Sequence, residues 1–176
     1  MIQPCAGRNA APLTYFTRRA DGAERYDPGF IFVTPGTDLI GNVANFQRVG
    51  VHALLIDACF QATQRVLAVT PYFVPDVSLE TAMRLAARRG VKIDLCIPAK
   101  SNYILADFVR NRSLRALSDA GVSIHLLPCM NHAKAVVFDD GIALCGSCNL
   151  DSRSLLLNYE SMVVFYDAPE IEWLAD

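Results

Sequence analysis

The residues best suited to chemistry stand close together in the last third of the chain. His132 and Lys134 are two positions apart, Asp139 follows, and six residues later a Gly-Ser-x-Asn run places Ser147 and Asn149. An imidazole can attack phosphorus or protonate a leaving oxygen. A lysine with hydroxyl, amide and backbone N–H donors can hold the oxygens of a phosphoryl group. This inventory predicts a phosphodiester site.

A β-hairpin is expected to position these groups. Residues 132–139 have the pattern of a strand, and residues 142–146 have that of its partner after an Asp-Gly turn. Because side chains i and i+2 share one face of a strand, His132 and Lys134 are expected on the same side. The hairpin would then return the loop that starts at Gly146 alongside them.

The rest of the chain alternates between expected helices and strands, which predicts the α/β fold class with a mixed sheet. Helices are expected at about 45–62, from Asp76 or Ser78 to Gly90, and at 104–119, and strands at 30–34, 65–70, 91–98, 122–127 and 158–166. Residues 1–29 have no steady period and are expected to be an irregular lead-in. Residues 30–176 are expected to form one domain.

Composition narrows the function classes. Hydrophobic residues make up 52% of the chain and charged residues 19%, which suits a packed core. The net charge is -2 and the pI about 5.9, so bulk charge gives no support for nucleic acid as a partner. The six cysteines are scattered in apolar runs, as free thiols would be. No signal peptide and no membrane-spanning segment are expected.

The spacing H-x-K-x4-D-x6-G-S-x-N resembles the HKD motif of the phospholipase D superfamily. The likeness covers about residues 30–176 and is to the C-terminal half of a two-motif enzyme. It implies a phospholipase D-like α-β-α sandwich that carries one HKD half. Several flanking segments are similar to the cardiolipin synthase branch: Thr70-Pro-Tyr-Phe-Val-Pro-Asp76, Arg89-Gly-Val91, Pro98-Ala-Lys100, Asn149-Leu-Asp-Ser-Arg-Ser154 and Asn158-Tyr-Glu160.

The resemblance implies a role for each matching residue. His132 would be the catalytic imidazole, and Glu160 would accept a hydrogen bond from its other ring nitrogen. Lys134 would bind the phosphate. Asn149 and Ser147 would bind it too. Asp139, the third letter of the motif, would be mainly structural or electrostatic and would hold the hairpin to its neighbours.

The resemblance also implies the reaction. Such enzymes work through a covalent phosphohistidine and need no metal or other cofactor. One histidine attacks and a second protonates the leaving alcohol, the C-terminal histidine usually taking the acid role. The expected activity is transfer of a phosphatidyl group, with phosphatidylglycerol as substrate and cardiolipin as product. The expected location is the surface of the bacterial cytoplasmic membrane, or the cytoplasm if the chain is expressed alone.

The chain carries one motif, whereas the chemistry needs two imidazoles. His52 and His125 lack the following lysine and aspartate and are expected to be packed or capping residues. The second motif is therefore expected from a missing N-terminal half or from a homodimer partner. Other hypotheses are a phospholipase D-type hydrolase, a single-motif nuclease acting as a dimer, and an inactive fragment that keeps the fold.

Three further features of the sequence need an interpretation. The C-x-x-C spacing of Cys145 and Cys148 is compatible with a redox pair or half a zinc site, although the phosphate loop already accounts for the residues between them. Tyr72 and Phe73 would either edge a lipid-facing mouth or plug the core. The arginines at 88, 89, 110 and 112 are expected on solvated helix faces.

Overall fold

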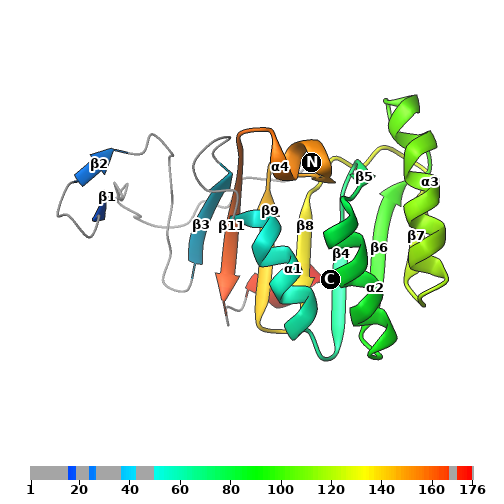
Figure 1. Ribbon diagram of the computed structural model, residues 1–176, viewed down its shortest axis with the longest axis horizontal. Coiled ribbons are helices and arrows are strands. Elements are labelled where there is room, and N and C mark those ends of the chain that lie inside the picture. The colour runs from blue at the N-terminus through cyan, green and yellow to red at the C-terminus, as the bar shows by residue number, and fades with distance from the viewer. Residues whose placement is uncertain (1–15, 19–23, 27–36, 43–49, 167–169, 176) are drawn as a thin grey trace.

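A mixed β-sheet forms the centre of the computed structural model, which describes residues 16–18, 24–26, 37–42, 50–166 and 170–175 (Figure 1). Within these residues, seven strands are ordered β3-β11-β9-β8-β4-β6-β7. The parallel strands are β4 (Arg65–Val69), β6 (Lys92–Pro98) and β7 (Ser123–Leu127). The antiparallel part consists of β3 (Thr37–Asn42), β11 (Glu160–Tyr166), β9 (Ile142–Gly146) and β8 (Ala135–Phe138). The predicted α/β class with a mixed sheet is confirmed.

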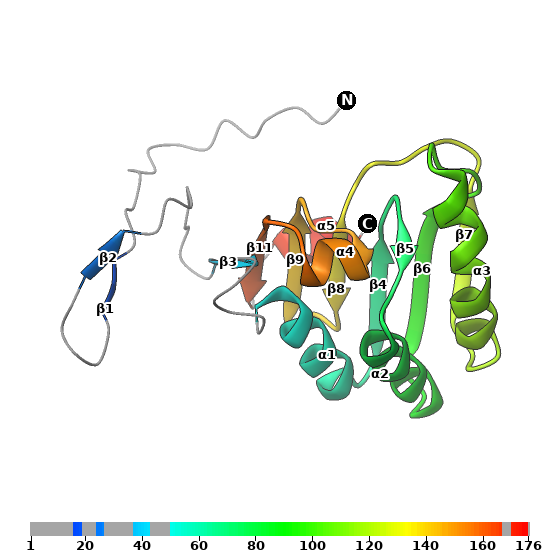
Figure 2. The same cartoon turned by 45° about the horizontal axis from the view of Figure 1, so that its top comes forward.

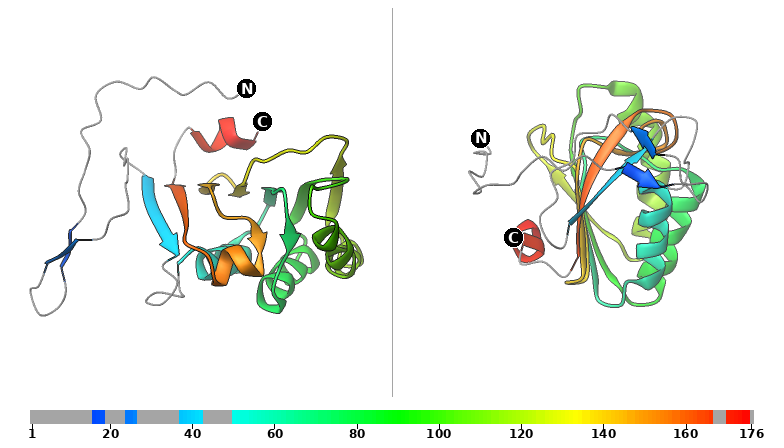
Figure 3. Two further views of the ribbon diagram at one scale, coloured as in Figure 1. Left: turned by 90° about the horizontal axis from the view of Figure 1, so that it is seen from above. Right: turned by 90° about the vertical axis from the view of Figure 1, so that its left-hand side faces the viewer.

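Helices cover both faces of this sheet. Figures 2 and 3 show α1 (Val51–Gln61) and α2 (Val77–Arg88) side by side on one face, and α5 (Glu170–Ala175) on the other. The third long helix, α3 (Ile104–Ser118), packs against α2 and the edge strand β7. The resulting α-β-α layering is the one that the resemblance to the phospholipase D superfamily implied.

Helix α2 forms where its start, stop and apolar signals coincide. The Asp76 side chain accepts the Ser78 N–H at 2.9 Å and so caps the first turn. Gly90, at φ +97°, lets the chain leave the last turn. One face of the helix is buried against the sheet, and it consists of Leu79, Ala82, Met83 and Ala86. Burial of each large apolar side chain on this face stabilises the fold by about 1.5–3 kcal/mol. The predicted helix and its cap are confirmed.

Helix α3 is tied to the end of β6 by a buried arginine. Arg110 donates from Nη1 to the Pro98 carbonyl and from Nη2 to the Ala99 carbonyl, both at 2.9 Å. Asp107 lies 3.1 Å from its Nη1 and balances the charge. The prediction of a solvated arginine is wrong at this position, because backbone carbonyls that leave the sheet still require donors. Arg112, two residues later, is exposed as predicted.

Some elements were too short to be recognised by periodicity. Within the segment predicted as irregular, β1 (Phe16–Arg18) and β2 (Glu24–Tyr26) pair antiparallel, so that prediction is wrong for these residues. The predicted loops also contain β5 (Phe73–Val74), β10 (Leu150–Asp151) and α4 (Ser152–Leu156). The predicted strand at 30–34 and the first residues of the predicted helix at 45–62 lie outside the described residues.

The parallel pair β5–β10 fixes the position of the loop that follows β9. Phe73 pairs with Leu150, and its ring is fully buried in the core between the helices and the sheet. Phe73 is therefore a core plug. Thr70 reinforces this junction by accepting the Leu150 N–H at 3.2 Å through its hydroxyl. Among the described helices, none is long and apolar enough to cross a membrane.

Candidate active site

The candidate catalytic residues lie at one edge of the sheet, where β4 and β6 end. Ala135, the first residue of β8, pairs with Val69, the last residue of β4. His132 comes just before this point and its side chain is exposed. In open α/β sheets, ligand sites form outside the carboxyl ends of the parallel strands, because the loops there converge. The fold thus brings the predicted imidazole to the edge where a ligand site is expected.

The position of His132 and Lys134 differs slightly from the prediction. Both were expected on a strand, but β8 begins at Ala135 and the two residues precede it. Asn131 turns the chain here, since its side-chain oxygen accepts the Ala133 N–H at 2.8 Å. The sheet ladder still reaches Lys134, whose carbonyl accepts the Gly146 N–H at 3.2 Å. Lys134 Nζ in turn donates to the His132 carbonyl at 2.8 Å.

Gly146 permits the close approach on which the site depends. It pairs with Met162, and a Cβ added at this position would lie 2.2 Å from the Ser161 carbonyl oxygen. Such contacts are far inside van der Waals distance and involve backbone, so no larger side chain fits without opening the β9–β11 pair. The glycine of the motif is therefore required by packing.

Beyond Gly146, the Ser147 side chain joins the two strands to Glu160. Its hydroxyl donates to Glu160 Oε2 at 2.5 Å and accepts the Ser161 N–H at 3.0 Å. The Asn158 amide donates to the other carboxylate oxygen, Oε1, at 3.1 Å. Glu160 is thus held on both oxygens. The sequence did not identify Asn158 as a hydrogen-bond partner of Glu160, although the Asn-x-Glu spacing is compatible with that contact.

Lys134 lies close enough to Glu160 for their charges to interact. Partial burial lowers the pKa of the Lys134 ammonium, and the Glu160 carboxylate partly opposes this by favouring the charged form. The structure therefore brings Lys134, Ser147 and Glu160 together beside His132. It forms no hydrogen bond between the His132 ring and Glu160 among the described residues, so that predicted contact stays a prediction.

Asn149 faces a different set of partners. Its amide Nδ2 donates to Ser154 Oγ at 3.0 Å, and its buried Oδ1 has no donor among the described residues. The Asp151 carboxylate caps α4 by accepting the Ser154 N–H at 2.8 Å. Asn149 is the last residue of the Gly146–Asn149 loop (the HKD loop), and it lines a cavity together with Asp151 and Ser154.

Asp139 lies at the opposite end of β8 from His132. Its carboxylate accepts hydrogen bonds from the backbone N–H groups of Thr63, Gln64 and Arg65, at 2.8–2.9 Å, and from the Thr63 hydroxyl at 3.0 Å. Burial opposes ionisation, but these hydrogen bonds outweigh it and lower the pKa of Asp139. Its contacts are those of a structural residue, which is the role that the resemblance implied for it.

The other titratable residues singled out in the sequence have structural partners. His52 Nε2 lies 2.8 Å from Asp76 Oδ1 and links α1 to the α2 cap, and His125 Nε2 lies 2.7 Å from Asp94 Oδ1. Cys145 and Cys148 are free thiols. Burial raises the pKa of Cys145, and burial with the nearby Glu160 and Asp151 charges raises that of Cys148 to about 12. These shifts disfavour the thiolate that a redox pair would need.

Known structures share this fold. Nuc from Salmonella typhimurium, a phospholipase D family member, matches with a TM-score of 0.64 at 18% identity, covering 79% of this chain and 88% of that one. NucT from Helicobacter pylori matches with a TM-score of 0.62 at 19% identity, covering 79% and 91%. The sheet and its flanking helices therefore form a phospholipase D-like fold.

The family follows from sequence comparison. The model of the cardiolipin synthase, phospholipase D-like domain matches residues 55–176, so the chain belongs to this family. It is 36% identical over 119 residues to cardiolipin synthase A of Klebsiella pneumoniae, and 34% identical over 130 residues to that of Buchnera aphidicola. These matches cover 67% and 73% of this chain but 24% and 27% of the relatives. The chain thus spans about a quarter of the length of the curated relatives it matches.

Proposed function

We propose that this chain supplies one half of a phospholipase D-type active site that transfers a phosphatidyl group to an alcohol. The observation that carries the proposal is the gathering of Lys134, Ser147 and Glu160 beside His132 at one edge of the sheet. A cation and fixed donors at this position suit the charge of a phosphodiester. Relatives that are cardiolipin synthases support a phospholipid as the substrate.

The proposed reaction has two displacements at phosphorus. One imidazole nitrogen attacks and forms a P–N bond while the P–O bond to the leaving alcohol breaks, and a second, protonated imidazole gives its proton to that oxygen. An acceptor alcohol then returns a proton to the second imidazole and attacks phosphorus, which breaks the P–N bond. His132 takes the acid role, Glu160 fixes its tautomer, and Lys134 and Asn149 hold the phosphoryl oxygens.

The second imidazole must come from outside this set of residues. One imidazole cannot be deprotonated for attack and protonated for release in the same step. We infer that a second HKD motif in an N-terminal half supplies it, which the greater length of the relatives supports. A two-fold homodimer that pairs His132 from each copy is the other arrangement.

The proposed substrate is phosphatidylglycerol and the proposed product is cardiolipin. Glycerol at the end of one lipid would serve as the acceptor alcohol, and water in its place would give hydrolysis. The chain would act as a peripheral part of an enzyme at the bacterial cytoplasmic membrane. A net charge of -2 gives no support for nucleic acid as the alternative substrate.

Turnover of His132→Ala tests the proposal in an assembly that converts phosphatidylglycerol. We expect a loss of roughly 10³-fold or more with the fold preserved in circular dichroism, because the residue serves chemistry. The matched control is His125→Ala, another exposed histidine, which should keep full activity. Activity of the His132 variant within tenfold of the parent would contradict the assignment. Plasmid cleavage without a lipid product would favour a nuclease activity over the lipid reaction.

Light scattering and a turnover assay on the 176-residue chain test in parallel whether its active site is complete without a second copy or a second motif. A monomer is expected to be nearly inactive. A dimer that turns over would favour the two-fold arrangement, and a monomer with full multiple turnover would overturn the two-imidazole argument.

A further inference from the structure

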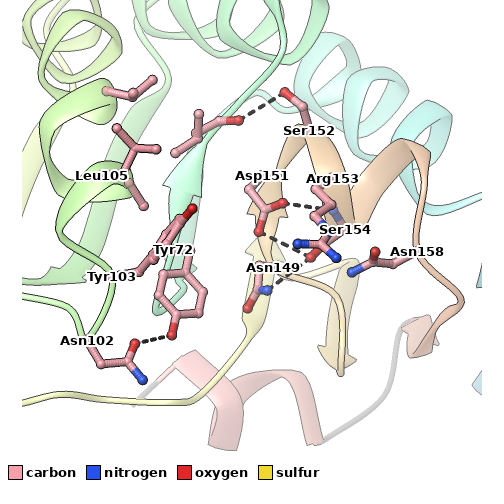
Figure 4. Close-up of a pocket in the computed structure, with 13 residues that line it drawn as sticks. Tyr72, Asn102, Tyr103, Leu105, Asn149, Asp151, Ser152, Arg153, Ser154 and Asn158 are labelled. Atoms are coloured by element: carbon pink, nitrogen blue, oxygen red, sulfur yellow. Dashed lines mark hydrogen bonds between the residues drawn. The ribbon is translucent and has the colours of Figure 1, made fainter.

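A cavity of about 610 Å³ lies between the first turns of α3 and the segment from Asn149 to Asn158 (Figure 4). Tyr72 from the loop before β5 lies between these walls, and its hydroxyl donates to the Asn102 side chain. Lys134, Ser147 and Glu160 do not line the cavity, but it is lined by Asn149 of the HKD loop and by Asn158, which donates to Glu160. Any molecule held in it would therefore reach the proposed phosphate site.

The α3 wall of the cavity is apolar. Leu105, Ala106 and Val109 line it. The apolar surface does not stop at the rim, because Ile104 is 85% and Phe108 75% exposed on the same turns. Contiguous exposed side chains of this size on a soluble surface mark contact with another apolar body. This wall suits hydrocarbon.

The opposite wall is polar and carries the Arg153 side chain together with hydrogen-bond acceptors (Figure 4). Asn149 Oδ1 is buried with no donor among the described residues, although buried polar atoms are almost always paired. In Figure 4 this oxygen points away from Ser154, to which the amide nitrogen donates. The Asp151 carboxylate lines the same wall; each of its oxygens accepts one hydrogen bond from Ser154 and has a second lone pair for a ligand hydroxyl. Hydroxyl groups of a ligand would satisfy these atoms.

We propose that the cavity between α3 and α4 binds the lipid substrate beside its phosphate, with glycerol hydroxyls on the Asn149–Asp151 wall and the acyl chain along the α3 wall. This inference rests on the proposed function, since it takes the phosphate to lie at the HKD loop. It assigns substrate selection to Val109 and its neighbours on α3, which the motif does not include.

The size of the cavity sets how much lipid it holds. At about 610 Å³ it lies within the roughly 300–1,000 Å³ that is usual for pockets of small ligands. That is enough for a glycerol end and the first methylenes of a chain but not for two complete acyl chains. The remaining methylenes would pass over Ile104 and Phe108. Arg112 and Arg115 are exposed further along α3, where they would attract anionic headgroups.

Binding of soluble short-chain lipids to the full 176-residue chain tests the inference without turnover. The probes are dihexanoyl phosphatidylglycerol, its deacylated form, and dihexanoyl phosphatidylmethanol, which lacks the headgroup hydroxyls. Calorimetry or NMR titration gives the affinities. Val109→Asp should lower the affinity for dihexanoyl phosphatidylglycerol at least tenfold and leave the affinity for the deacylated form within twofold. The matched control is Leu85→Asp on α2, where the side chain is 40% exposed against 48% for Val109.

We also expect the parent chain to bind dihexanoyl phosphatidylmethanol more weakly than dihexanoyl phosphatidylglycerol. Ala106→Trp, which fills the cavity without adding charge, should reproduce the loss seen with Val109→Asp. Equal affinities of the Val109 and Leu85 variants, or no binding by the parent, would overturn the inference. Because no turnover is involved, this failure is distinguishable from failure of the proposed function, which the His132 variant tests separately.

Discussion

The hydroxyl of Ser147 donates to Glu160 Oε2 at 2.5 Å and ties the loop after β9 to the first residue of β11. The same hydroxyl accepts the Ser161 N–H, so both of its polar functions are used within the protein. The motif predicts Ser147 as a phosphate ligand, whereas these contacts favour a role in positioning Glu160. The two roles predict different kinetics.

Ser147→Ala should lower kcat by about tenfold to hundredfold with little change in KM, because Glu160 would keep only its bond to Asn158. Ser147→Thr retains the hydroxyl and should recover most of the activity. The pH profile of kcat should shift in the alanine variant if Glu160 acts on His132. A higher KM at unchanged kcat would return Ser147 to the role of phosphate ligand.

Gly146→Ala should destabilise the protein by about 1–3 kcal/mol, because its Cβ would collide with the Ser161 carbonyl across the β9–β11 pair. Urea unfolding measures the change. Gly90→Ala is a useful comparison: it has φ +97° but no atom within 4 Å of the added Cβ, so it should cost about 1–2 kcal/mol through strain alone and leave activity intact. A Gly146 variant as stable and active as the parent would refute the packing argument.

Asp139→Asn should lower stability at pH 7 by about 1–2 kcal/mol, because the amide can replace only part of the four hydrogen bonds. The folded-state pKa of Asp139 is lowered, so its carboxylate stabilises the fold fully above the unfolded pKa of about 3.9. That contribution is lost as the pH falls through the lower folded value. The difference between variant and parent should therefore shrink below pH 4.

Asp140→Asn is the matched control for this measurement. Asp140 pairs with Arg65 at 2.7 Å, but its side chain is 78% exposed, so the change should cost less than about 1 kcal/mol. Equal losses for the two variants, or a loss that does not depend on pH, would contradict the structural role of Asp139. Neither variant should alter kcat directly, because both residues lie at the far end of β8 from His132.

Turnover of an active assembly should be retained within twofold in the presence of a strong chelator, because the Lys134 ammonium supplies the positive charge for the proposed phosphate site. Parallel assays with and without chelator measure this. Loss of activity that zinc or magnesium restores would contradict the expectation. Such a loss would favour a metal site, for which Cys145 and Cys148 are candidate ligands.

The sequence alone determined the motif, the main helices and strands, and the family. These features are recorded in local patterns: residue types at fixed offsets, apolar residues at helical spacing, and caps such as Asp76. It also predicted the separate roles of His132 and Asp139. Elements of two or three residues, such as β5 and β10, were missed because they are too short to have a period.

Only the tertiary structure decided which distant groups meet. The Thr63 backbone reaches Asp139 across 76 positions of sequence, and Arg110 folds inward onto the end of β6 although its neighbours on the helix are exposed. Tyr72, in the loop before β5, and Val109, in α3, line the same cavity. Such contacts depend on how layers pack and on which backbone groups the sheet leaves unpaired, and no local spacing encodes them.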